Sequence, residues 1–221
     1  MTSRAQSKRV RMLPEERRAE IVQTAARIAL EEGLELITLR RVADALGVRP
    51  GLISHYFPVA DALVSEAFTF ATTKERESLL PPHEEGQSPV LRLALVLVRL
   101  ADEDYLDLSR LWLNARHLSR FKDALRQAVS TQESATRSAF VALITHGVQA
   151  GEFATDDVLK TALHILITVD GLGSYANADA SQEGLDISDA AIETAETRLG
   201  LAPGTLRALA RSAEPAAVGP Q

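Results

Sequence analysis

The chain has 221 residues, of which 46% are hydrophobic, and it carries 24 Lys and Arg against 30 Asp and Glu. This length and composition suit a small domain joined to a larger one with a sizeable core. The absence of cysteine excludes a disulfide framework and thiolate chemistry. The sequence lacks a secretory signal and any uncharged apolar run of about 18 residues, so we expect a cytoplasmic protein with no membrane partner.

The net charge of −6 is unevenly distributed along the chain. Residues 1–60 hold ten Lys or Arg against seven Asp or Glu, whereas residues 61–221 hold fourteen against twenty-three. A mildly basic N-terminal part on an acidic body is typical of a protein that has one end facing DNA.

The first elements in chain order are a basic arm and a helix. Residues 1–12 are polar and basic, and this arm either enters a minor groove, as basic arms do, or is a disordered tail. Pro14 opens a helix with acidic residues in its first turn, where the helix dipole favours them. Gly33 ends this helix.

Residues 38–57 predict two short helices joined by a tight turn. Apolar residues recur at helical spacing over residues 39–46, so the first helix has one apolar face. Gly47 can adopt the positive φ that a sharp turn requires, and Pro50 stands where a second helix would begin. This is the layout of a helix-turn-helix, in which the second helix enters the major groove of DNA.

The motif supplies a set of candidate DNA contacts. They are Thr38, Arg40, Arg49, Pro50, Gly51, Ser54, His55 and Tyr56. Arg49, Pro50, Gly51, Ser54 and His55 form the base-facing set. Arg40 and Arg41 either are solvated or place at least one guanidinium on the DNA backbone. Thr38 either only caps its helix or also donates to phosphate. Tyr56 either bonds phosphate or packs inside, and the alternative for the whole set is an ordinary exposed helix surface.

The rest of the chain predicts further helices and no strand. They span residues 59–80, 89–101, 102–117, 119–150 and 156–176, and a last helix begins at Ser188 and is broken near residues 202–204. The helix of residues 89–101 is apolar on most faces and should be buried. The tail of residues 213–221 contains Pro and Gly and is expected to be disordered. The fold class is therefore all-α, with about nine helices.

Three residues of the body are candidates for ligand binding. Tyr105 and Trp112 are seven residues apart and share one helix face, so they either line a cavity or belong to the core. Asp170 interrupts an apolar helix, and a buried carboxylate needs a partner. That partner is either an Arg or a helix terminus, or else a cationic ligand that the aromatic rings also attract.

Metal, cofactor and catalytic sites are not expected. His117, His146 and His164 fall on three different expected helices without the short spacing of metal ligands. No nucleophile elbow, phosphate-binding glycine loop or His-Glu-x-x-His motif occurs. The chain is therefore not expected to be an enzyme, and no cofactor is implied.

The motif resembles the TetR family of bacterial transcriptional repressors. The pairs Val42-Ala43 and Gly47-Val48 and the run of residues 55–58, His-Tyr-Phe-Pro, carry the resemblance, which extends over about residues 17–70. Segments 147–153 and 170–173 are similar to the branch that includes the choline-responsive BetI repressors.

The resemblance implies a two-domain homodimer. Residues 13–58 would form the DNA-binding domain, and residues 59–212 an effector-binding and dimerisation domain that pairs through its last two helices. The protein would then be a ligand-responsive regulator, a repressor that a small hydrophobic or cationic effector releases from a near-palindromic operator on double-stranded DNA. The alternative is a DNA-binding regulator controlled by a protein partner, without a small-molecule effector.

The motif departs from the family pattern at three positions. Arg49 stands where many relatives have a capping Ser or Thr, and Ala60 stands where many have a phosphate-binding Lys. Ser54 replaces a frequent Tyr. Arg49 can itself attract phosphate or read guanine, but Ala60 can do neither, so we expect one backbone contact fewer and a different operator sequence.

Overall fold

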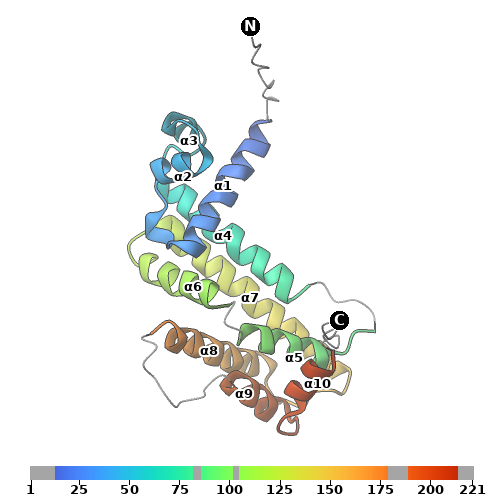
Figure 1. Ribbon diagram of the computed structural model, residues 1–221. Helices are drawn as coiled ribbons and strands as arrows, with labels where there is room; N and C mark the ends of the chain where they lie inside the picture. The colour runs from blue at the N-terminus through green and yellow to red at the C-terminus, as the bar shows by residue number, and fades with distance from the viewer. Residues whose placement is uncertain (1–12, 82–85, 102–104, 179–188, 214–221) are drawn as a thin grey trace, which may run out of the picture.

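The computed structural model describes residues 13–81, 86–101, 105–178 and 189–213, and within these residues it is all-helical. It contains the ten α-helices and one short 3-10 helix shown in Figure 1. Their bounds are α1 Pro14–Glu31, η1 Leu34–Leu36, α2 Leu39–Leu46, α3 Pro50–Tyr56, α4 Ala60–Leu79, α5 Pro89–Leu100, α6 Leu106–Leu118, α7 Asp123–Gln149, α8 Val158–Ala176, α9 Ala190–Leu199 and α10 Thr205–Ala213. The all-α prediction is confirmed.

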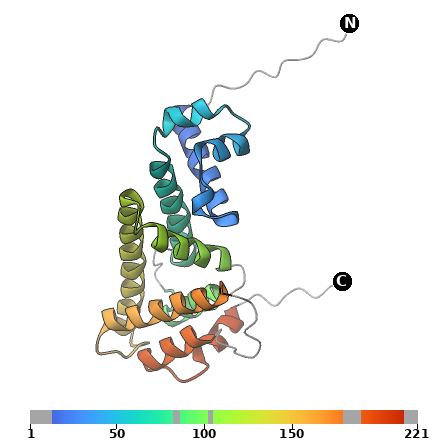
Figure 2. The ribbon, with the colours of Figure 1, turned by 90° about the vertical axis from the view of Figure 1, so that its left-hand side faces the viewer.

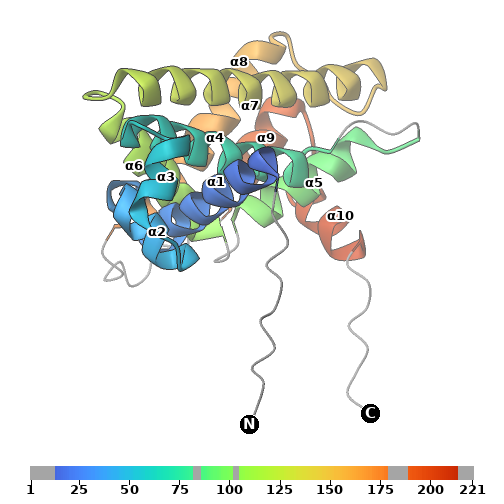
Figure 3. The same cartoon turned by 90° about the horizontal axis from the view of Figure 1, so that it is seen from above.

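The first three α-helices form a small unit at one end of the molecule, and α8 to α10 lie at the opposite end (Figures 1 and 2). Helices α4 and α7 run between the two ends. Viewed from above, α7 extends along one side of the molecule, and α1 lies nearer the opposite side (Figure 3). The N-terminal unit is therefore separated from α8–α10 by the length of the central helices.

Two hydrophobic clusters make up the core. The upper cluster joins α1–α4 to part of α6 and to the first half of α7, through residues such as Phe68, Leu111 and Leu125. The lower cluster joins α5, the second half of α7 and α8–α10, and it includes Phe140 and Ile165. The upper cluster crosses residue 58, so the N-terminal unit packs directly on the body; the domain boundary at that residue stays a prediction.

The expected helices and their observed bounds differ by a few residues. The expected break near residues 202–204 is present and separates α9 from α10, which raises the number of α-helices in the described residues to ten. The break is stabilised in part by Glu196. This buried carboxylate accepts hydrogen bonds from the backbone N–H groups of Gly204 and Leu206, both at 2.8 Å. These bonds satisfy amide groups at the start of α10 that have no partner within the helix.

The burial expected of α5 holds over most of its surface. Five of its residues are buried and most of the others are partly buried, whereas Leu95, which is 44% exposed, and Arg99 face solvent. The predicted arm of residues 1–12 and nearly all of the predicted tail lie outside the described residues. No helix among the described residues is long and apolar enough to cross a membrane.

Candidate DNA-binding and ligand-binding sites

The helix-turn-helix is formed by α2 and α3. Thr38 caps α2, because its hydroxyl accepts a hydrogen bond of 3.0 Å from the backbone N–H of Arg41. Gly47 ends α2 with φ of 63°, in the left-handed region that favours glycine. Pro50 occupies the first turn of α3, where its missing N–H costs nothing. Buried Ile53 and Phe57 hold α3 on the upper cluster.

All eight candidate DNA contacts reach the surface. Seven are exposed, and Tyr56 is half-buried because it packs against the upper cluster. The ring of His55 meets that of Tyr56 edge to face, with centroids 5.3 Å apart. Ser54 donates from its hydroxyl to the carbonyl of Pro50, at 3.2 Å, on its own helix. These positions leave the surface of α3 accessible to a partner, and contact with DNA stays a prediction.

The two arginines of the first motif helix differ in their contacts. Arg40 is 86% exposed and makes only a 4.0 Å contact with Asp44. The Arg41 guanidinium forms two hydrogen bonds to Glu32, and this pairing raises the pKa of Arg41 and lowers the pKa of Glu32. Arg40 is therefore the arginine of α2 that is available for phosphate. Arg49, at the start of α3, makes no side-chain cap and is exposed.

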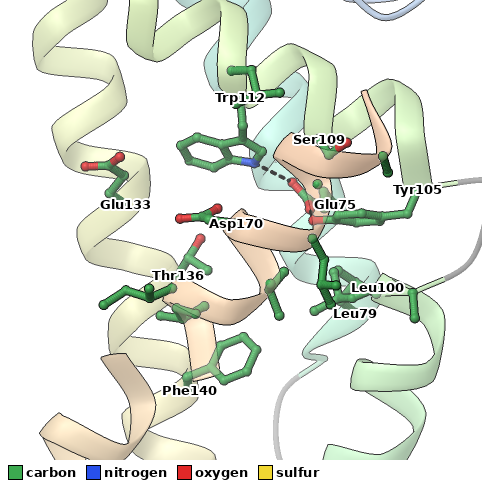
Figure 4. Close-up of a pocket in the computed structure, with 18 of the residues that line it drawn as sticks. Glu75, Leu79, Leu100, Tyr105, Ser109, Trp112, Glu133, Thr136, Phe140 and Asp170 are labelled. Atoms are coloured by element: carbon green, nitrogen blue, oxygen red, sulfur yellow. Dashed lines mark hydrogen bonds between the residues drawn. The ribbon is translucent and has the colours of Figure 1, made fainter. Parts of the chain in front are cut away.

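A cavity of about 560 Å³ lies between the two hydrophobic clusters, where α4, α6, α7 and α8 meet. The three candidate ligand-binding residues, Tyr105, Trp112 and Asp170, all line it (Figure 4). Its apolar wall includes Leu79, Leu100, Phe140 and Leu166. This volume is in the range of small-molecule sites, which combine apolar walls with a few polar groups.

Among the residues that line the cavity, Glu75 has the largest shift in pKa. Its carboxylate accepts a hydrogen bond from Trp112 Nε1, at 3.3 Å, and another from the Tyr105 hydroxyl. Burial raises the pKa of Glu75 to about 8, even though the bond from Trp112 acts in the opposite direction. Neutral and charged forms of this carboxyl group are therefore both accessible near neutral pH.

Asp170 is not buried as expected. Its side chain is 48% exposed, since it projects from α8 toward the cavity rather than into the core. The expected Arg partner is present: Arg116 donates to Asp170 and to Glu133, each at 2.9 Å. The same guanidinium lies 5.3 Å from the centre of the Trp112 ring. Arg116 thus joins α6, α7 and α8 at the cavity.

Helix α6 connects the cavity to the N-terminal unit. Trp112 faces the cavity, and its ring meets Phe68 of the upper cluster edge to face, with centroids 5.0 Å apart. From the same helix, Arg110 donates to the carbonyl of Leu30 at the end of α1, at 2.7 Å. Asn114 donates to Glu35 in η1, at 3.0 Å. A displacement of α6 would therefore change its contacts with α1 and η1.

The apolar face expected for dimerisation on the last helix is turned inward. Ile192, Ala195 and Leu199 are buried in the lower cluster of their own subunit. Of the last three helices, α8 is the one on which large apolar residues are exposed in the described part of the chain, including Leu159 and Ile167. Pairing through the last two helices stays a prediction.

The two glycines of α8 differ in their surroundings. An added Cβ at Gly173 would lie 2.8 Å from the Cβ of Ser109 on α6, so α6 and α8 pack closely there. An added Cβ at Gly171 would meet nothing within 4 Å.

Sequence reasoning missed Glu75, Arg116 and Phe140 as cavity residues. A signal existed for Glu75, because it follows Ala67 and Ala71 at intervals of four residues on the buried face of α4. No comparable signal existed for Arg116, whose two partners are distant in sequence. Among the described residues, no group of three His, Cys, Asp or Glu could hold a metal ion.

The model for "Bacterial regulatory proteins, tetR family" matches residues 21–67, which include the whole helix-turn-helix. In this segment the chain is similar to the TetR family of bacterial regulatory proteins. The matched segment contains the entire predicted DNA-contact set. No curated protein matches the chain.

Solved structures similar to this one include several TetR-family and other transcriptional regulators. A TetR-family regulator from Rhodococcus sp. is 22% identical with a TM-score of 0.69, and the match covers 84% of this chain and 99% of that one. A regulator from Saccharomonospora viridis in complex with choline is 19% identical with a TM-score of 0.64, covering 81% and 94%. FadR from Bacillus subtilis in complex with stearoyl-CoA is 20% identical with a TM-score of 0.61, covering 82% and 97%. The whole chain therefore has the fold of a TetR-family transcriptional regulator.

Proposed function

We propose that the protein is a homodimeric transcriptional repressor that leaves a near-palindromic DNA operator when a small molecule enters the cavity. One observation carries the proposal: α6 lines the cavity with Trp112 and, from the same helix, hydrogen-bonds to α1 and η1 of the helix-turn-helix unit. The unit that carries the helix-turn-helix is thus joined to the wall of a ligand-sized cavity through one helix, α6.

DNA binding would use α3 in the major groove. Three residues are suited to phosphate. Arg40 is an exposed cation, Thr38 stands at the N-terminus of α2, and Tyr56 has a hydroxyl group on a half-buried side chain. Arg49, Ser54 and His55 would read base edges, and an arginine at this position can bind guanine in bidentate fashion. Gly51 would let the helix approach the DNA closely, because nothing lies within 4 Å of the position that its Cβ would occupy.

Dimerisation would use α8. Leu159, Leu163 and Ile167 follow one another at intervals of four residues and are 51%, 37% and 64% exposed. An apolar stripe of this kind is the usual core of a helix-pairing interface. A twofold dimer formed here would present two copies of α3 to two half-sites, which accounts for a near-palindromic operator.

Release from DNA would follow from the position of the cavity between the two clusters. A ligand that separates α6 from α8 favours a displaced α6, and the Arg110 and Asn114 contacts transmit that displacement to α1 and η1. The ligand shifts the equilibrium only as far as it binds the displaced form more tightly. The spacing between the two reading heads then no longer matches the operator.

The test is selection of bound duplexes from a random library, followed by footprinting at about 50 and 200 mM salt. We expect enrichment of one near-palindromic site, protection of two half-sites about one helical turn apart, and binding that weakens steeply with salt. No enrichment, or an affinity independent of salt, would contradict the proposal. Enrichment of a single half-site would contradict the dimer but leave DNA recognition in place.

A regulator controlled by a protein partner remains the competing function. It predicts that bulky side chains placed in the cavity leave DNA affinity unchanged. If cavity occupancy controls release, Thr136→Trp should weaken DNA binding in the absence of any ligand, because Thr136 lines the cavity from α7.

A further inference from the structure

Glu75 is a carboxylate without an ion-pair partner among the described residues. The groups that donate to it, the Trp112 indole and the Tyr105 hydroxyl, are both neutral. The neighbouring cation, Arg76, donates instead to Gln132 Oε1 at 2.7 Å. A buried carboxylate that lacks a cation either takes up a proton or gains a positive partner. The cavity that it faces offers room for such a partner.

The walls around Glu75 also favour positive charge. The Trp112 ring and Tyr105 lie on one side of the space, and Asp170 points into it from α8 (Figure 4). Aromatic faces attract cations within about 6 Å of the ring, by about 0.5–2 kcal/mol. Farther from the charged groups, Leu79, Leu100 and Phe140 provide an apolar surface.

The cavity wall carries cations as well as carboxyl groups. Besides Glu75 and Asp170, its charged groups are Arg76, Arg116, Glu133 and Arg137. The single Arg116 guanidinium pairs with both Asp170 and Glu133, so these three groups together keep one negative charge. Arg76 and Arg137 donate to the neutral side chains of Gln132 and Ser134 and keep their positive charge. A cation near Trp112 would therefore meet Glu75 and Asp170, with Arg116 as the neighbouring cation.

We propose that the effector is an organic cation whose positive group lies between Glu75, Trp112 and Asp170, with its apolar part against Leu79, Leu100 and Phe140. This inference rests on the proposed function, since it names the ligand class of the same cavity. A quaternary ammonium and a protonated amine share the required chemistry. The cation supplies the positive partner that Glu75 lacks.

Binding of the cation has a consequence for protons. The free carboxyl group, with a pKa of about 8, is largely protonated at neutral pH and must ionise to pair with the cation. Binding near pH 7 therefore releases close to one proton, and the affinity rises about tenfold per pH unit until the pH approaches 8. The other charged groups that face the same space are Asp170, Glu133 and the three arginines.

The experiment is isothermal titration calorimetry of the full chain with four probes. Hexyltrimethylammonium and hexylammonium are the cations, 1-octanol is the neutral probe, and octanoate is the anion. We expect a cation to bind at least about tenfold more tightly than the other two probes, and to release a proton in buffers of different ionisation enthalpy. The ratio between the two cations separates a quaternary ammonium site from an amine site.

The decisive variant is Glu75→Gln, which keeps the shape of the side chain and an acceptor oxygen for the Trp112 indole. It should lose about tenfold or more in cation affinity and lose the proton release, while 1-octanol binds as before. Glu77→Gln is the matched control, because it removes the same charge from an exposed position on the same helix. Full cation affinity in Glu75→Gln would overturn the inference.

Two further results would also overturn it: tighter binding of octanoate or 1-octanol than of either cation, or no cation binding up to millimolar concentration. DNA binding of the ligand-free protein is measured on the same preparations. Intact, salt-dependent DNA binding together with failure of the cation test would reject the inference and leave the proposed function standing.

Discussion

At the residue scale, Gly51 combines a structural cost with an expected functional role. It occupies the first turn of α3, where glycine has more freedom to lose on folding than alanine. An added Cβ at this position meets nothing within 4 Å. Packing therefore gives no reason for glycine here, whereas close approach of DNA does.

Gly51→Ala should separate stability from DNA binding. We expect the free energy of unfolding to rise by roughly 0.5 kcal/mol, because alanine is the better helix former. DNA affinity should fall about tenfold if the new methyl group meets the DNA backbone or a base edge. Thermal unfolding and fluorescence anisotropy with the selected operator measure the two effects.

Gly171→Ala is the control for stability, since it is also a helical position with no atom near the added Cβ. It should give the same gain in stability. DNA affinity of Gly51→Ala equal to that of the wild type would remove Gly51 from the set of DNA contacts.

Glu75 makes the stability of the free protein depend on pH. Its pKa is about 8 in the folded chain and has its ordinary value of 4.5 when exposed, so the folded state holds the proton more tightly. The contribution of Glu75 to the free energy of unfolding is therefore greatest at low pH. It falls as the pH rises from about 5 to 8, by on the order of 1 kcal/mol per pH unit.

Glu75→Gln removes this dependence. We expect its melting temperature to exceed that of the wild type at about pH 8, and the difference to shrink toward about pH 4, where the carboxyl group is mostly protonated in both states. Scanning calorimetry across this range tests the prediction, with Glu77→Gln as the control. A difference that does not change with pH would mean that Glu75 is already ionised in the folded chain.

At the element scale, the sequence patterns of α8 and α9 are alike, but their surroundings differ. Both helices carry apolar residues at helical spacing, yet α9 buries its stripe in the lower cluster while α8 leaves Leu159 and Ile167 exposed. Periodicity shows that a helix has an apolar face. It does not show whether the helix's own subunit or a partner covers that face. The tertiary structure was therefore needed before α8 could be proposed as the dimer face.

Leu159→Glu should disrupt the dimer. Leu159 is 51% exposed and does not line the cavity, so the substitution costs a folded subunit little. Two new carboxylates near a twofold interface would repel each other and remove apolar contact. We expect light scattering to give a monomer and operator affinity to fall by about two orders of magnitude.

Leu95→Glu provides the control, because Leu95 is a similarly exposed leucine on α5. It should remain dimeric and bind DNA normally. If Leu159→Glu remains dimeric, the subunits pair through another surface.

The difference between local and distant contacts explains which site residues the sequence could predict. The ends of α2 and α3 and the capping role of Thr38 depend on residues within a few positions, and the sequence predicted them. Tyr105 and Trp112 were found through spacing on one helix. Spacing could place Glu75 on the buried face of α4, but the partners of Glu75 and Arg116 lie 17 to 54 residues away along the chain, and spacing carries no information about such contacts.

At the scale of the whole molecule, α6 is the element common to the cavity and the DNA-binding unit. It belongs to the upper cluster through Leu111 and Ala115 and reaches the cavity through Trp112. Its other links to the N-terminal unit are the hydrogen bonds of Arg110 and Asn114. Ligand binding and DNA release can be coupled only through contacts that differ between the two states.

The double variant Arg110→Ala/Asn114→Ala should weaken this coupling without removing either activity. Each hydrogen bond contributes on the order of 1 kcal/mol, and coupling energies of about 1–3 kcal/mol are typical. We expect the ratio of operator affinities without and with saturating hexyltrimethylammonium to fall about tenfold. Cation affinity of the DNA-free protein should stay within about twofold of wild type, because neither side chain lines the cavity.

Anisotropy titrations with the operator, in the absence and presence of the cation, measure this ratio. Arg27→Ala is the control, since it removes an exposed arginine of α1 that pairs only with Glu31 on its own helix. If the double variant responds to the cation as fully as the wild type, the signal does not pass through Arg110 and Asn114. The packing of Trp112 on Phe68 would then be the remaining direct connection from the cavity to the upper cluster among the contacts described above.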